Sequence, residues 1–295
     1  MLRKIVVKKI IYNKPIKVQL YNMLITFNYL NIFLFGICIG SFLNVVVYRF
    51  QKNLSIIKPR SFCPQCKNKL TIRENIPLIS YLIQRGKCLN CNTSISFRYP
   101  LIELITGILF VIFIYSSPSF YGSNSNLLLN NIFGWLLLSI LICIALIDIE
   151  SFWIPQGLIN FGFISGVLCL ISMSIFNNEE FLDIYLIAKG FGTSLVSYGI
   201  FELLRYSAKC IFKKDAIGKG DSKFVAMLSI WLGPLGTLFA VGMSYIFAAI
   251  YCLIALSINL IRLKQVIPFG PFLSLGGLLT WFLGNEFIIE KILHI

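Results

Sequence analysis

Residues 127–147 read Leu-Leu-Leu-Asn-Asn-Ile-Phe-Gly-Trp-Leu-Leu-Leu-Ser-Ile-Leu-Ile-Cys-Ile-Ala-Leu-Ile and contain no charged side chain. About 20 apolar residues in a helix are enough to cross a bilayer. Similar runs recur along the 295-residue chain, which is 57% hydrophobic and 13% charged, with a mean hydropathy of +0.82. A soluble domain usually has about 45–50% apolar and about 25% charged residues. The composition excludes a soluble fold and predicts an all-α, polytopic membrane protein.

Apolar runs at seven places in the chain predict about eight transmembrane helices. They cover residues 24–48, 100–116, 127–147, 155–176, 182–204, 222–261 and 270–289. The run 222–261 is broken by Gly233-Pro234 and is long enough for two crossings, or for one crossing and a bent re-entrant piece. Two crossings are preferred because seven spans would move Arg262 and Lys264 to the acidic side of the membrane.

The formal net charge of +14 is concentrated in particular loops. Ten basic residues lie between Arg49 and Arg98, with one acid, and six lie between Arg205 and Lys223. Cytoplasmic loops of membrane proteins are enriched in Lys and Arg. We therefore place loops 49–100, 148–154, 205–221 and 262–269 in the cytoplasm. The basic charge then reflects topology and contact with the lipid bilayer, and no nucleic acid partner is expected.

This topology divides the chain into four parts. Residues 1–22 form a basic N-terminal extension, 23–48 the first transmembrane helix, 49–100 a cytoplasmic loop, and 101–295 a transmembrane core. The extension has six basic residues and no acid, yet the count of spans puts it outside the cell. We expect it to be either an extension or the result of a misassigned start.

Four of the nine cysteines form two Cys-x-x-Cys knuckles in the cytoplasmic loop. They are Cys63, Cys66, Cys88 and Cys91. This spacing is typical of a tetrahedral four-cysteine zinc site. A loop of about 50 polar residues builds little core, so a structural zinc ion would contribute directly to its folding. Disulfides and a vestigial metal site are the competing interpretations, although disulfides are rare in the reducing cytosol.

Two aspartates stand at the ends of predicted helices. Asp148 follows the quoted run directly, and Asp221 closes Gly218-Lys219-Gly220-Asp221 before another apolar run. The predicted topology puts both at the cytoplasmic boundary. Two carboxyl groups a few ångströms apart hold one proton between them, so one can activate water while the other polarises a peptide carbonyl. Gly218 and Gly220 carry no side chain and would let a substrate backbone approach Asp221.

Other interpretations of these acids remain open at this point. An aspartate at a helix edge is often only a cap, and intramembrane acids also serve as cation sites in transporters. Glu150 and Lys223 are accessory candidates, and Lys223 could pair with Asp221 or with Glu150. The single histidine is His294, close to the C-terminus, so a Ser-His or Cys-His nucleophile has no base.

Taken together, these motifs resemble the bacterial type IV prepilin peptidases, which are membrane aspartic proteases. The matching segments are Gly40–Arg49, Cys63–Cys66, Glu74–Pro77, Ser80–Leu82, Arg85–Cys88, Ile95–Pro100 with Glu103, Asp148 with Ile154–Pro155, Gly218–Asp221 with Lys223, and Pro268–Phe272. They run in order from about residue 30 to about residue 280. Gln156 departs from the family pattern, which commonly has an acid there, and Glu150 stands where a second aspartate is frequent.

The resemblance implies an activity and a location. Asp148 and Asp221 would be the catalytic pair, cleaving a basic leader peptide from type IV prepilins or type II secretion pseudopilins. The site would face the cytoplasm in the bacterial inner membrane. Many members also methylate the new N-terminus with S-adenosylmethionine. A transporter, or an inactive scaffold of the pilus or secretion apparatus, is a weaker alternative, because the acids cluster at one membrane boundary and both aspartates are retained.

The leader peptide expected from this resemblance is basic. A basic leader would be repelled by the basic loop 49–100. We expect the loop to meet anionic lipid headgroups instead. Glu150 or Glu74 would then help to hold the leader.

Overall fold

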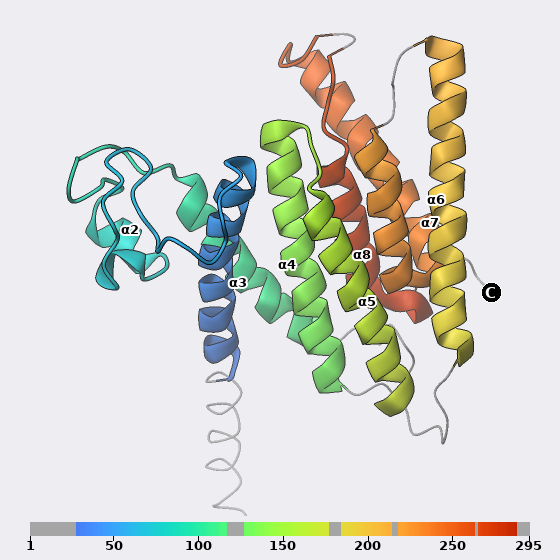
Figure 1. Ribbon diagram of the computed structural model, residues 1–295, viewed down its shortest axis with the longest axis horizontal. Helices are drawn as coiled ribbons and strands as arrows, with labels where there is room; N and C mark the ends of the chain where they lie inside the picture. The colour runs from blue at the N-terminus through green and yellow to red at the C-terminus, as the bar shows by residue number, and fades with distance from the viewer. Residues whose placement is uncertain (1–27, 117–126, 177–183, 214–217, 263–264, 288–295) are drawn as a thin grey trace, which may run out of the picture. The chain divides into compact units, whose positions relative to one another are not determined.

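The computed structural model describes residues 28–116, 127–176, 184–213, 218–262 and 265–287. Within these ranges the chain is helical, and its β-structure is limited to two isolated bridges, Phe62–Lys69 and Lys87–Ser94. The helices are an N-terminal helix over Asn28–Gln51, η1 (Arg73–Asn75), α2 (Ile79–Ile83), α3 (Arg98–Ser116), α4 (Leu127–Ser151), α5 (Gln156–Phe176), α6 (Ile184–Phe212), α7 (Lys219–Ser257) and α8 (Gly270–Phe287) (Figure 1). The predicted all-α class is confirmed.

Eight crossings fit the helices. The N-terminal helix, α4, α5, α6 and α7 are each long and apolar enough to span a membrane. The shorter helices α3 and α8 coincide with two further predicted spans, and α7 contains two. The predicted extension 1–22 lies outside the described residues. The N-terminal helix continues to Gln51, three residues beyond the expected boundary.

Helix α7 reverses direction in its middle (Figure 1). Gly233 has a φ of 64° and a ψ of −175°, and Pro234 follows it. Such a backbone conformation is essentially restricted to glycine. Asp221 and Tyr245 would be about 36 Å apart on one straight helix, yet their side chains interact electrostatically. This reversal fits the preferred prediction of two crossings in this segment.

The chain divides into two compact units. The first contains the N-terminal helix up to Phe42 together with Arg60–Ile112, and the second contains Leu43–Pro59 and the chain from Phe113 onward. Each is built around close helix packing.

In the first unit, the N-terminal helix crosses α3 at very short range. A Cβ atom at Gly36 would lie 2.8 Å from Cα of Gly107, and one at Gly40 would lie 2.8 Å from Cα of Glu103. Glycines four residues apart lie on one helix face and let two backbones approach. Because lipid tails give no hydrophobic advantage to helix association, this close van der Waals contact is the main source of cohesion here.

In the second unit, α7 packs against both α5 and α6. The indole Nε1 of Trp231 donates a 2.8 Å hydrogen bond to the carbonyl oxygen of Gly162 in α5. The hydroxyl of Ser194 in α6 donates a 2.8 Å hydrogen bond to the carbonyl oxygen of Ala226. Both side chains are buried. Their hydrogen bonds fix the position of α7 along its axis relative to α5 and α6. The first turn of α7, which carries Asp221, is thereby positioned.

Candidate active site and metal centre

Asp148 lies near the end of α4 and is only 5% exposed. Its Oδ2 atom accepts a 2.8 Å hydrogen bond from the backbone N–H of Gly270, the first residue of α8. The first N–H groups of a helix have no partner within the helix and carry a partial positive charge. The start of α8 therefore offers Asp148 a fixed donor. A Cβ atom at residue 270 would lie 2.7 Å from the same oxygen, so only glycine fits without a shift.

Asp221 lies in the first turn of α7 and is partly buried. Its Oδ2 atom accepts a 3.2 Å hydrogen bond from the backbone N–H of Gly218, the residue that caps the helix. The carboxylate thus closes the start of its own helix, as the N3 residue does in a capping box. Gly218 has an extended backbone, so its absence of a side chain is not required by its φ angle.

The fold brings the two predicted aspartates together. Helix α8 packs against both α4 and α7. The charge of Asp148 acts directly on Asp221, which places the two carboxyl groups within electrostatic range of each other. The phenol of Tyr245, in the second half of α7, also interacts with Asp221. One end of the second unit therefore carries a pair of acids, each held by a backbone N–H at a helix start.

Gly220 and Lys223 contact the connection between α4 and α5. A Cβ atom at Gly220 would lie 3.2 Å from Cβ of Ile154, so the missing side chain makes room for that isoleucine. The Nζ atom of Lys223 donates a 2.6 Å hydrogen bond to Oε1 of Gln156, at the start of α5. Its described partner is thus neither Asp221 nor Glu150, the two acids considered from the sequence.

Glu150 follows Asp148 by two residues on α4 and is exposed. Its carboxylate accepts a hydrogen bond from the side-chain amide of Gln51, at the end of the N-terminal helix. Glu150 therefore places a carboxylate at the same end of α4 as the buried aspartate.

Two contacts of this site escape prediction from the sequence. Gly270 stands in the run Pro268–Phe272 directly before an apolar span, which indicates a helix start, but nothing in that run indicates a bond to Asp148. Tyr245 lies within an apolar run and carries no sequence signal at all. Its position depends on the reversal at Gly233.

The four predicted cysteines converge in the first unit. The Sγ atoms of Cys63, Cys66, Cys88 and Cys91 all lie within 4.8 Å of one another. The Sγ atoms of Cys63 and Cys91 are 3.8 Å apart. Four sulfurs bound to zinc at about 2.3 Å in a tetrahedron lie about 3.8 Å apart. The cluster can therefore hold a metal ion, and none of the nine cysteines, all of which lie in the described residues, forms a disulfide bond.

Backbone turns shape each knuckle. The N–H of Lys67 donates a 2.8 Å hydrogen bond to the carbonyl oxygen of Cys63, and the N–H of Asn92 donates one of 2.9 Å to that of Cys88. Lys67 and Asn92 both have positive φ angles, which complete these tight turns. The hydroxyl of Thr93 lies 3.0 Å from Sγ of Cys91 and lowers the pKa of that thiol to about 6. The thiolate, the form that binds metals, is thereby favoured.

Comparisons with known proteins agree with this architecture. The family described as the type IV leader peptidase family matches residues 135–253, which contain both aspartates. The family described as the bacterial peptidase A24 N-terminal domain matches residues 34–117, which contain the four cysteines. The chain belongs to the type IV leader peptidase family, as its resemblance to prepilin peptidases predicts.

Individual relatives match over most of their length. The type 4 prepilin-like proteins leader peptide-processing enzyme of Escherichia coli O78:H11 is 32% identical, over 84% of this chain and 91% of that protein. The prepilin leader peptidase/N-methyltransferase of Legionella pneumophila is 32% identical, over 89% and 93% of the two chains. That of Neisseria gonorrhoeae is 30% identical, over 82% and 86%. No solved structure matches this chain.

Proposed function

We propose that this protein is a membrane aspartic endopeptidase that removes the basic leader peptide from type IV prepilins or type II secretion pseudopilins. It works at the cytoplasmic face of the bacterial inner membrane and then methylates the new N-terminus. The observation that carries the proposal is the interacting pair Asp148 and Asp221 at one end of the second unit. The names of its relatives supply the substrate class and the methyl transfer.

The two carboxyl groups divide the chemistry of peptide hydrolysis. Oδ2 of Asp148 is engaged by Gly270, and Oδ2 of Asp221 is engaged by Gly218. In this proposal the other oxygen of each aspartate, Oδ1, acts on the reacting groups. One carboxylate draws a proton from a water molecule while the protonated partner polarises the scissile carbonyl. A reaction of this kind forms no covalent enzyme intermediate, and the single histidine of the chain is not needed.

Substrate binding would use the residues around the acids. Gly218 precedes Asp221 and is exposed, so an extended substrate backbone can approach it. The exposed carboxylate of Glu150 is suited to a basic leader. Lys223 would act indirectly, because its hydrogen bond to Gln156 joins α7 to the start of α5.

The four cysteines would hold a structural zinc ion. The first unit has only two short helical turns, η1 and α2, between its membrane helices, so its loop buries little apolar surface. Four thiolates bound to one zinc ion would tie residues 63–66 to residues 88–91 and stabilise the loop against unfolding.

Methyl transfer rests on the relatives alone. Among the described residues we find no glycine-rich loop after a strand, the usual cradle for a nucleotide-like cofactor. We therefore assign no residue to S-adenosylmethionine and derive no catalytic step through it.

Analysis of the products tests this proposal. The purified protein in lipid vesicles is incubated with a prepilin that carries its leader, with and without S-adenosylmethionine, and the products are identified by mass spectrometry. The proposal predicts a single hydrolytic cut that adds one water molecule across the cleaved bond and needs no methyl donor. It also predicts one further methyl group on the mature N-terminus when the methyl donor is present. An intact substrate would refute the peptidase assignment, and a cut product that is never methylated would refute the second activity.

A further inference from the structure

The loop of the first unit exposes an unusual amount of aliphatic surface in one short segment. Five isoleucine and leucine side chains there are between 40% and 78% exposed. They are Ile72, Ile76, Ile79, Leu82 and Ile83. We call residues 72–85 the interfacial segment.

The most exposed of these side chains share one face. Ile79, Leu82 and Ile83 lie at positions i, i+3 and i+4 of α2, so they point to the same side of that helix. Ile72 caps η1, which packs against α2. The exposed apolar side chains of these two neighbouring helical turns therefore lie close together.

Basic side chains flank this patch. Arg73 and Arg85 are exposed within the segment, and Lys69 and Lys87 are exposed just outside it. The one acid, Glu74, is engaged locally, because its Oε2 atom accepts hydrogen bonds of 2.8 Å and 2.7 Å from the backbone N–H and the hydroxyl of Thr71. Exposed apolar side chains beside an excess of basic residues are typical of segments that lie in a membrane interface.

The segment is bonded to the first turns of α3, near residue 100, where the sequence predicts that a membrane span begins. The backbone N–H of Leu78, which caps α2, donates a 2.8 Å hydrogen bond to Oε2 of the buried Glu103. Glu103 is five residues into α3, only about 7.5 Å along the helix from its start at Arg98. The headgroup region on each side of a bilayer is several ångströms thick. This hydrogen bond therefore holds α2 within reach of the lipid headgroups.

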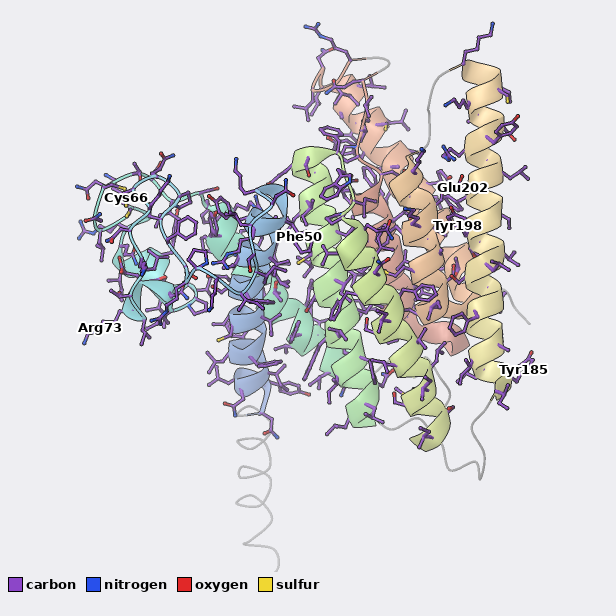
Figure 2. All side chains as sticks on the ribbon, in the orientation of Figure 1. Phe50, Cys66, Arg73, Tyr185, Tyr198 and Glu202 are labelled. Atoms are coloured by element: carbon purple, nitrogen blue, oxygen red, sulfur yellow. The ribbon has the colours of Figure 1, made fainter. Side chains whose placement is uncertain are left out.

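We propose that the interfacial segment is a membrane-docking surface that inserts Ile79, Leu82 and Ile83 among the headgroups of anionic lipids. Arg73 and Arg85 bind the lipid phosphates, while the four cysteines remain at the other end of the loop. Figure 2 shows Cys66 and Arg73 at opposite ends of this part of the structure. The proposal is independent of the peptidase assignment, since it concerns lipid and not substrate.

Photo-crosslinking of the full-length protein tests the proposal. Leu82 is replaced by the photoreactive residue p-benzoyl-phenylalanine, and the protein is reconstituted in phosphatidylcholine vesicles with or without about 30% phosphatidylglycerol. The control carries the same probe at Asn68, an exposed residue beside the Cys63–Cys66 knuckle. Adducts are identified by mass spectrometry, and thermal unfolding verifies that both proteins are folded.

The proposal predicts lipid adducts at position 82, in several-fold higher yield than at position 68, and more of them in the anionic vesicles. Arg73→Gln and Arg85→Gln should each lower the yield about fivefold, the factor that corresponds to one basic residue near an anionic surface. Crosslinks from position 82 to residues 113–287 or to a second copy of the chain would overturn the proposal. So would equal lipid yields at the two positions, or in the two kinds of vesicle.

Discussion

The backbone N–H of Gly270 donates a 2.8 Å hydrogen bond to Oδ2 of Asp148, so the first residue of α8 holds the acid at the end of α4. These residues are 122 positions apart in the sequence. The contact joins the helix of one aspartate to α8, which also packs on the helix of the other, α7. Gly270 is thus a positioning residue for the pair.

Substitution of Gly270 by alanine should disturb this geometry. The new Cβ atom would lie 2.7 Å from Oδ2 of Asp148, so the carboxylate and the N–H donor must separate. A lost hydrogen bond to a charged group costs about 1.5–3 kcal/mol. We expect kcat for leader cleavage to fall by roughly 10- to 150-fold. Gly242→Ala is the matched control, since no atom lies within 4 Å of its added Cβ, and an equal loss in both variants would contradict the positioning role.

Charge reversal at Glu150 should weaken binding of the basic leader. Glu150→Lys places a positive charge where the leader is expected, and like charges repel. We expect KM to rise with little change in kcat, measured with a prepilin at low ionic strength. Gln51→Ala removes the hydrogen bond to Glu150 without altering its charge and should have little effect on KM. Unchanged processing by Glu150→Lys would exclude this role.

Removal of a cysteine should release the metal and loosen the loop. Cys63→Ser or Cys88→Ser leaves three sulfur ligands, and a zinc ion bound by them would link the two knuckles less firmly. We expect about one zinc ion per freshly purified wild-type chain. Each variant should bind much less zinc and exchange the backbone hydrogens of residues 60–97 faster. Cys38→Ser, outside the cluster, is the control. A wild-type protein without metal would refute the assignment.

The reversal in α7 should depend on the glycine at its centre. Alanine at residue 233 meets no neighbouring atom, but it would have to adopt a φ of 64° with a ψ of −175°. Strain of this kind costs about 1–3 kcal/mol. We expect Gly233→Ala to lower the unfolding temperature in detergent, whereas Gly242→Ala should not. Equal stability of the two variants would show that another conformation is accessible at this bend.

Much of this architecture could be predicted from the sequence because it follows from local chemistry. Apolar runs must form helices in a bilayer, where every backbone polar group needs an internal partner. The spacing of Cys63, Cys66, Cys88 and Cys91 indicates a metal cluster before any fold is known. Asp148 and Asp221 are conspicuous because acids are costly at the ends of membrane helices.

The remaining features depend on packing between distant segments. Gly270 and Tyr245 reach the acids only because α8 packs against α4 and α7 reverses its direction at Gly233. The partner of Lys223 proved to be Gln156, since the amide lies at the start of α5 beside the first turn of α7. Likewise, the space left by Gly220 is occupied by Ile154, a contact between the first turn of α7 and the α4–α5 connection that no local pattern encodes.

The rate of leader cleavage by Asp148→Asn and Asp221→Asn tests the central claim most directly. Both variants keep the size of the side chain and remove its ability to transfer a proton. The matched control is Glu202→Gln, since Glu202 lies on α6 (Figure 2). This substitution neutralises an acid that pairs with Arg205. If the two aspartates form one catalytic unit, each substitution lowers the rate by about 100- to 10,000-fold, and Glu202→Gln retains the wild-type rate. A folded Asp148→Asn or Asp221→Asn variant that cleaves at the wild-type rate would contradict the account.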